Sequence, residues 1–245
     1  MIVGFVGSGS MAAAMARGWA GEFEQMLFSD SGSGRARALA DELGGEAATN
    51  AEIATRADLV VVAVKPAKLD DVAPELAAAR RIVSVLAAVP VERLNGAFPQ
   101  AEALRVMPNV GVEVRKGVLC VAGTASEEVL AKLGTLGRVV ELPDADFDAA
   151  TAVMGCAPAY LALAIEAIAD AGAADGLDPE LSRELVVETA AGTAELLRRQ
   201  HPADLRKAVA SPGGSTEAGL EALDRGGAAA AFEAAVRASL ERMRG

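Results

Sequence analysis

The residues whose types and spacing point most directly to chemistry stand near the start of the chain. Gly7-Ser8-Gly9-Ser10-Met11-Ala12 follows an apolar run and opens a helical stretch, with the G-x-G-x-x-A spacing of a dinucleotide-binding turn. Gly7 permits a tight turn, Gly9 lets the backbone approach a pyrophosphate, and Ala12 lets helix and strand pack closely. The helix would present its free amides and positive dipole end to the phosphates. These features predict a dinucleotide site, in preference to a purely structural strand–helix turn.

The residues after the second apolar run bear on which dinucleotide is bound. Asp30 could grip the ribose 2′-hydroxyl of NAD and would repel a 2′-phosphate. Four later side chains could instead hold the 2′-phosphate of NADP, namely Ser31, Ser33, Arg35 and Arg37. The two sets of residues conflict. We expect NADPH, with NADH as the alternative.

A second candidate site is a glycine-rich turn late in the chain, Ser211-Pro212-Gly213-Gly214-Ser215-Thr216. Its first four residues are typical of a turn, and its last two would begin a helix. The glycines leave backbone amides accessible, and the hydroxyls of Ser211, Ser215 and Thr216 add hydrogen-bond donors. A small carboxylate of the amino-acid type would fit there, although an ordinary helix cap would also explain the pattern.

Composition excludes several classes of protein. Of 245 residues, 52% are apolar but only 3% are aromatic, so the core must consist of Ala, Val and Leu. The net charge of −11 argues against nucleic acid or an anionic membrane as partner. No apolar run approaches the roughly 18 residues that span a bilayer, and we see no signal peptide. Cys120 and Cys156 fit neither a disulfide framework nor a zinc site, and the single histidine, His201, excludes a histidine metal cluster. We expect a reduced, cytoplasmic protein without a metal.

Short apolar runs alternate with helical stretches through the first half of the chain. The predicted strands are residues 2–6, 25–29, 58–64, 81–86, 104–107, 117–121 and 139–141. The clearest is 58–64, because a continuous β-branched run is typical of a strand buried on both faces. Helices are expected between them, for example over 11–20 and 35–43. Such alternation predicts a doubly wound, parallel α/β sheet of the Rossmann type.

The pattern changes near residue 145, beyond which we find no convincing strand. Helices are predicted over 146–173, 178–199, 203–209, 216–225 and 228–244, with Pro158 as a kink or break in the first. In Gly176-Leu177-Asp178-Pro179, glycine would end one helix, while aspartate would cap the next and proline would begin it. We therefore expect a dinucleotide-binding domain at 1–145 and an all-helical domain at 146–245. The alanine-rich helices form a thin core, which favours a dimer interface over packing within one chain.

Several segments together identify a family. They are Val64-Lys65-Pro66, Arg105-Val106-Met107-Pro108-Asn109, Met154-Gly155-Cys156-Ala157-Pro158-Ala159-Tyr160, Asp170-Ala171-Gly172-Ala173-Ala174-Asp175-Gly176-Leu177, His201-Pro202-Ala203-Asp204-Leu205, the 211–216 turn, Gly219-Leu220 and Gly226-Gly227. This set resembles the pyrroline-5-carboxylate reductase family nearly from end to end. The Ser-Pro-Gly-Gly-x-Thr element is its most specific part.

The resemblance implies NAD(P)H-dependent reduction of the C=N bond of 1-pyrroline-5-carboxylate to L-proline, the last step of proline biosynthesis. It implies a substrate site at Ser211, Gly213, Gly214, Ser215 and Thr216, with Thr216 as the catalytic residue at the ring nitrogen or carboxylate. The cofactor positions, from the first turn and the resemblance together, are Gly7, Ser8, Gly9, Ser10, Met11, Ser31, Arg35, Asn50, Val64, Lys65, Pro66, Ala87, Pro108 and Asn109. An iminium is already a strong electrophile, so positioning should supply most of the acceleration. Family members form interlocked dimers through the helical domain, often assembled into rings.

The chain departs from the family pattern at three places. The family has Ser-Gly-Ser-Gly-Pro-Ala where this chain has residues 154–159, an acidic residue in place of Lys207, and a glycine in place of Ala88. A reductase of another imine, or a nucleotide-binding homologue without turnover, therefore stays open. A β-hydroxyacid dehydrogenase shares the domain plan but needs a positioned base, for which the helical half offers only Lys207 and His201.

Overall fold

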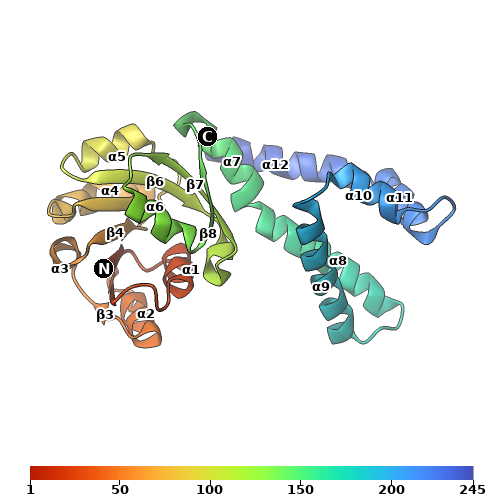
Figure 1. Ribbon diagram of the computed structural model, residues 1–245, viewed down its shortest axis with the longest axis horizontal. Coiled ribbons are helices and arrows are strands. Elements are labelled where there is room, and N and C mark those ends of the chain that lie inside the picture. Colours follow the sequence, from red (N-terminus) through yellow and green to blue (C-terminus); the bar gives the residue numbers. More distant parts are fainter. Residues whose placement is uncertain (245) are drawn as a thin grey trace. The chain divides into compact units, whose positions relative to one another are not determined.

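The protein is described here by a computed structural model covering residues 1–244, which divides into two compact units (Figure 1). The first unit contains Met1–Gly155 and the last turn of the C-terminal helix from Met243 on. The second unit contains Cys156–Arg242. The first holds every strand among the described residues, and the second is helical.

The first unit is built on one sheet of eight strands in the order β3-β2-β1-β4-β5-β6-β7-β8. The strands are β1 Ile2–Val6, β2 Gln25–Ser29, β3 Glu46–Ala47, β4 Leu59–Val62, β5 Arg81–Ser84, β6 Glu102–Pro108, β7 Gly117–Gly123 and β8 Gly137–Glu141. β1 and β2 have the predicted bounds, whereas β4 and β5 end two residues early (62 against 64, and 84 against 86), where the chain leaves the sheet for loops. The two-residue strand β3 was not predicted, because it has no apolar run of its own.

The predicted doubly wound, mainly parallel sheet is confirmed, and one pair of strands in it is antiparallel. β7 runs antiparallel to β6, with Val106 opposite Val121, while the other pairs are parallel. The connection through residues 109–116 contains only the short 3₁₀ segment η3, Val110–Val114. A parallel return needs a crossover of a dozen or more residues, so this link permits only an antiparallel neighbour.

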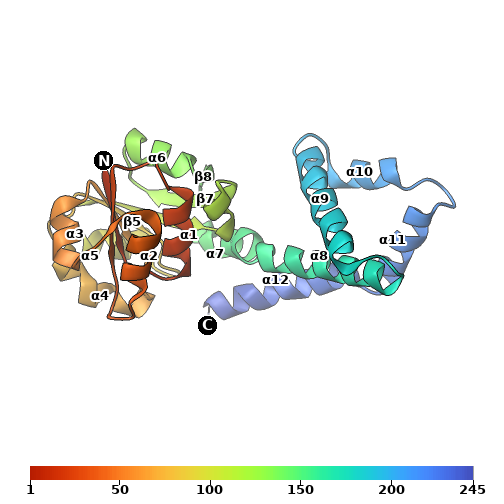
Figure 2. The ribbon, with the colours of Figure 1, turned by 90° about the horizontal axis from the view of Figure 1, so that it is seen from below.

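Helices cover both faces of the sheet, as the doubly wound class requires (Figure 2). One face packs against α1 Ser10–Gly18, α2 Arg35–Leu43 and α6 Glu127–Gly134, and its core includes Phe5, Phe28 and Trp19. The other packs against α3 Asn50–Arg56, α4 Leu69–Val72 and α5 Val91–Ala97. Alternate residues of each central strand serve the two faces, which is why those strands are apolar throughout.

The predicted helix over 146–173 is three segments. It comprises α7 Phe147–Ala150, a π-helical turn at Thr151–Gly155, and α8 Ala157–Ala174. Of the predicted kink or break, the structure has a break: Pro158 lies in the first turn of α8, where its missing N–H costs no hydrogen bond. The break precedes the proline and is made by the π turn.

The rest of the second unit follows the predicted stop and start signals. It contains α9 Pro179–Leu197, α10 Pro202–Val209, α11 Ser215–Arg225 and α12 Ala228–Arg244. The Asp178 carboxylate accepts a hydrogen bond from the Leu181 amide at 3.0 Å and so caps α9. Helices α8 and α9 approach closely: the buried Ser182 hydroxyl of α9 donates a hydrogen bond to the Ala169 carbonyl of α8 at 2.7 Å.

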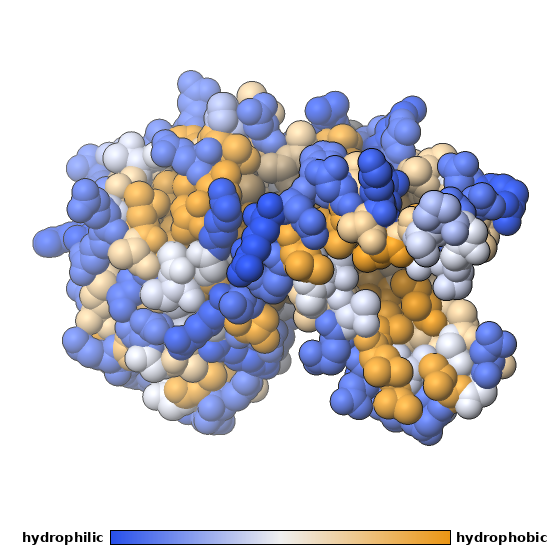
Figure 3. Space-filling view, turned by 45° about the vertical axis from the view of Figure 1, so that its right-hand side comes forward, coloured by the Kyte–Doolittle hydropathy of each residue, from blue (hydrophilic) through white to orange (hydrophobic). Residues whose placement is uncertain are grey.

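Large apolar side chains lie on the surface of the second unit. Leu161, Leu163 and Ile168 of α8 are 60%, 64% and 60% exposed, whereas the buried residues of these helices are Ala169 and Ser182. Figure 3 shows the hydrophobic residues of this unit at the surface. By length and composition the stretch Asp144–Ala174 could even cross a membrane. Its most apolar 18 residues have a mean hydropathy of 1.7, and 11% of them are buried. The sequence expectation that no stretch is this apolar was wrong, because small alanines carry much of its hydropathy.

Candidate active site

The turn after β1 places two glycines where the backbone needs close approach. Gly7 has φ of +95°, and a Cβ there would lie 2.7 Å from the Ala63 carbonyl oxygen. Gly9 is the N-cap of α1, with open space where its side chain would be. Ala13 is the first residue of α1 to bond back, to the Gly9 carbonyl at 2.9 Å. Within the described chain, the amides of residues 10–12 therefore have no acceptor, and the turn is an anion cradle that side chains do not fill.

Ser8 faces the protein interior and not the open side of this turn. Its buried hydroxyl donates to the Ser29 carbonyl at 2.9 Å. The Ser29 hydroxyl in turn donates to the Asn50 side-chain oxygen at 2.6 Å. This chain of hydrogen bonds ties β1, β2 and the first residue of α3 together. Ser8 and Asn50 thus shape the turn through their side chains, while Ser10 is exposed beside it and Met11 is half-buried.

The other predicted cofactor residues follow neighbouring strands at the same edge of the sheet. β1, β2, β4, β5 and β6 are parallel, so their carboxyl ends lie side by side. Val64, Lys65 and Pro66 follow β4, Ala87 follows β5, Pro108 ends β6, and Asn109 follows it. The sheet order reverses direction between β1 and β4, and ligands of doubly wound sheets bind beside such a reversal. The structure therefore gathers these residues on one edge.

The loop after β2 uses Asp30 for its own folding. The Asp30 carboxylate accepts hydrogen bonds from the amides of Ala36, Gly32 and Ser33 at 2.8, 2.7 and 3.0 Å. The Ser33 hydroxyl also donates to it at 3.0 Å. These bonds, the Ala36 amide foremost, lower the pKa of Asp30 below its ordinary value. Arg35 and Ser31 are exposed, and the Arg35 Nε donates to the Ser33 hydroxyl at 3.1 Å.

Asn109 has both ends of its amide occupied by the protein. Its nitrogen donates to the Met154 carbonyl at 3.2 Å, and its oxygen accepts from the Val118 amide at 3.1 Å. A π turn leaves carbonyls without their usual helical partners, and Asn109 satisfies the one at Met154. The side chain of Asn109 thus fastens β6 to the segment in which the family pattern is altered. Cys156, in that segment, is half-buried and unpaired with any other cysteine.

Ala88 stands in a backbone conformation that favours glycine. Its φ is +58°, in the left-handed region, in the exposed loop after β5. The family pattern has glycine at this position, so the departure noted in the sequence carries a strain that glycine would avoid.

Arg105, named from the sequence only as part of a family segment and without a role, has a structural one. It is buried in β6, where Nη1 lies 2.8 Å from Asp144 Oδ1 and the guanidinium lies 4.2 Å from the centre of the Phe147 ring. A single arginine within the apolar strand 104–107 is the signal that could have found it. Its contacts fasten the segment before α7 to the sheet.

The turn at 211–216 in the second unit has the backbone of a type II turn. The Gly214 amide bonds to the Ser211 carbonyl at 2.9 Å, Pro212 holds the first corner, and Gly213 has φ of +74° at the second. A Cβ on Gly214 would lie 2.7 Å from the Ser211 hydroxyl oxygen, so this position also needs glycine. The turn runs directly into α11.

Three amides at the start of α11 are free to bind an anion. Ala218 is the first residue of α11 to bond back, to the Gly214 carbonyl at 3.2 Å. Residues 215–217 therefore have no acceptor for their amides among residues 1–244. The hydroxyls of Ser211, Ser215 and Thr216 are exposed beside them. Amides and hydroxyls in this arrangement form a carboxylate-binding corner.

Sequence comparison gives two family matches. The family described as "Pyrroline-5-carboxylate reductase dimerisation" matches residues 144–245, and "NADP oxidoreductase coenzyme F420-dependent" matches residues 2–88. The pyrroline-5-carboxylate reductase of Synechocystis is 39% identical over 204 residues, which are 79% of this chain and 76% of that protein.

Solved structures agree over almost the whole chain. The pyrroline-5-carboxylate reductase of Streptococcus pyogenes superposes with a TM-score of 0.86 at 29% identity, covering 99% of this chain and 98% of that one. The NADP-bound pyrroline carboxylate reductase of Plasmodium falciparum gives a TM-score of 0.85 at 27% identity, with coverages of 99% and 97%. The chain therefore belongs to the pyrroline-5-carboxylate reductase family of NAD(P)H-dependent oxidoreductases.

Proposed function

We propose that this protein reduces the C=N bond of 1-pyrroline-5-carboxylate to form L-proline. The observation that carries the proposal is the 211–216 turn with its three hydroxyls, followed by the three free amides of residues 215–217, in a chain of this family. A cyclic imino acid presents one carboxylate and one ring nitrogen. The corner binds the carboxylate, and the Thr216 hydroxyl is placed beside it to hydrogen-bond the ring nitrogen or the carboxylate.

The first unit holds the nicotinamide dinucleotide. The amides of residues 10–12 bind its pyrophosphate, with Gly7 and Gly9 allowing close approach. When bound, the reduced cofactor supplies a hydride to the imine carbon. The protein contributes chiefly position: an iminium accepts hydride readily, so alignment of substrate and cofactor replaces elaborate acid–base chemistry.

NADPH is the preferred cofactor in this proposal. An acidic residue at the end of β2 selects NAD by bonding the ribose hydroxyls, but the Asp30 carboxylate already accepts four hydrogen bonds from its own loop. The same loop leaves Ser31 and Arg35 exposed, and a guanidinium suits a 2′-phosphate. The NADP-bound relative from Plasmodium supports this assignment.

The helical region forms a homodimer. Its large apolar side chains are exposed in the single chain, so a second copy is needed to cover them. The family match over 144–245 describes dimerisation. We take this face, and not a lipid bilayer, as the reason for the high hydropathy of Asp144–Ala174. Domains at 1–145 and 146–245, a higher ring of dimers, a cytoplasmic location and the absence of nucleic-acid and membrane partners complete the proposal.

The test is direct. Purified protein is mixed with racemic 1-pyrroline-5-carboxylate and NADPH or NADH, and loss of cofactor absorbance is followed together with proline formation. Proline production with a larger kcat/KM for NADPH is expected. Cofactor binding without turnover would contradict the proposal and would favour the nucleotide-binding homologue. Turnover of a six-membered cyclic imino acid in preference to the five-membered one would assign another substrate.

A further inference from the structure

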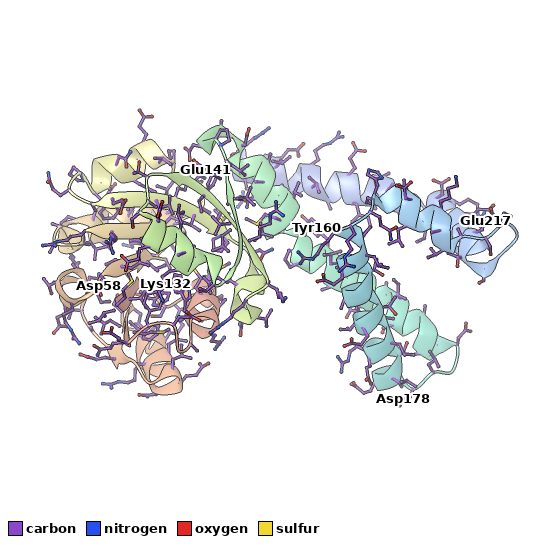
Figure 4. The ribbon with its side chains drawn as sticks, viewed as in Figure 1. Asp58, Lys132, Glu141, Tyr160, Asp178 and Glu217 are labelled. Carbon is purple, nitrogen blue, oxygen red and sulfur yellow. The ribbon has the colours of Figure 1, made fainter. Side chains whose placement is uncertain are left out.

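A carboxylate of the protein itself accepts a hydrogen bond from a backbone amide of the 211–216 turn. Glu217 lies in the first turn of α11, and its Oε2 accepts a hydrogen bond from the Gly213 amide at 2.7 Å. Figure 4 shows the Glu217 side chain at the start of this helix. An internal anion thus occupies the Gly213 amide, which lies beside the corner in which the proposed substrate carboxylate would bind.

We propose that Glu217 sets the affinity of this site for carboxylates by competing with the substrate. This inference rests on the proposed function. Gly213 precedes the first free amide, that of Ser215, by two residues, so two carboxylates bound there would lie close together. Two carboxylates that lie close together repel one another, and the single Gly213 amide cannot donate a hydrogen bond to both.

The partial burial of Glu217 and its lack of an ion pair within the described chain support this competition with the substrate. The side chain is half-buried, so solvent screens it less than it would a fully exposed carboxylate. No lysine or arginine forms an ion pair with it among residues 1–244, whereas Glu221 one turn later pairs with Arg225 at 3.7 Å. The charge of Glu217 therefore acts on the turn without a cation to offset it.

The alternative is a purely structural cap, in which the Glu217 carboxylate satisfies the Gly213 amide just before the N-cap residue, Gly214. The two roles differ in what the charge does. Glutamine keeps an acceptor for the Gly213 amide but removes the charge, while alanine removes both. A cap requires the acceptor, whereas competition requires the charge.

The experiment compares Glu217→Gln, Glu217→Ala and the control Glu221→Gln with the unmodified protein. We expect Glu217→Gln to lower the KM for 1-pyrroline-5-carboxylate about threefold to tenfold, with kcat nearly unchanged. Glu221→Gln should leave the KM unchanged. An unchanged or raised KM in Glu217→Gln would overturn the competition, and a raised KM only in Glu217→Ala would assign the cap.

A binding measurement separates this inference from the proposed function. Calorimetry in the presence of NADP⁺ compares L-proline with L-prolinamide, which lacks the carboxylate. Glu217→Gln should tighten proline binding by the same factor and leave prolinamide unchanged. Failure of the unmodified protein to reduce the imine would overturn the function, while the proline-to-prolinamide ratio would still decide the role of Glu217. Equal effects on both ligands would refute that role.

Discussion

The carboxylate of Asp30 accepts a hydrogen bond from the Ala36 amide at 2.8 Å, so the loop after β2 is fastened to the first turn of α2. The residue type expected at the adenosine ribose is therefore part of a local cap. This contact makes the loop a rigid frame for the exposed side chains on either side of it.

Asp30→Asn should destabilise the first unit by about 0.5–2 kcal/mol at pH 7, the usual cost of losing a helix cap. The folded state lowers the pKa of Asp30, so its stabilisation is present above the ordinary carboxyl value of about 3.9 and is lost as pH falls through the lower folded value. Denaturant unfolding across pH should show the difference from the unmodified protein shrinking in acid. Asp41→Asn, at an exposed position of the same helix, is the control and should change stability at pH 7 by no more than about 0.5 kcal/mol.

Arg35→Ala should separate the two cofactors. We expect the KM for NADPH to rise about tenfold, because a charge-assisted hydrogen bond to a phosphate is worth about 1.5–3 kcal/mol. The KM for NADH should stay within twofold, since NADH has no 2′-phosphate. Initial rates with both cofactors make the comparison, and equal losses would contradict a role for Arg35 at the phosphate.

Gly172→Ala should destabilise the second unit by about 1–3 kcal/mol through overpacking. The added Cβ would lie 2.5 Å from the Ser182 hydroxyl oxygen, where α8 and α9 touch. Thermal unfolding should show the loss, and Ser182→Ala in the same chain should recover part of it in a double-mutant cycle. Gly192→Ala is the matched control, because it adds a Cβ in open space and should stabilise its helix.

Ala88→Gly should leave stability unchanged or raise it by up to about 1 kcal/mol. Relief of the positive φ gains about 1–2 kcal/mol, and the greater freedom of glycine in the unfolded chain offsets part of that. Ala87→Gly, one residue earlier and without a positive φ, should lose about 0.5–1 kcal/mol. Equal losses in the two variants would show that Ala88 carries no strain.

Local chemistry made much of the fold predictable from the sequence. The glycine turn at 7–12, the strands 2–6 and 25–29 and the restart at Asp178-Pro179 depend on neighbouring residues, and the structure has each turn, strand and helix start where the sequence placed it. The Ser-Pro-Gly-Gly turn is equally local, since proline and glycine dictate its two corners. The family resemblance drew on these same segments.

Contacts between distant residues decided the rest. The reversal of β7 depends on a short link and on pairing with β6, and the π turn before α8 is matched by Asn109, 45 residues away. Asp30, which the sequence placed at the adenosine ribose, instead accepts hydrogen bonds from backbone amides that the folding of its own segment brings to it. Residue types determine which hydrogen bonds are possible, but only the tertiary structure decides which donor and acceptor meet, because that depends on backbone placement.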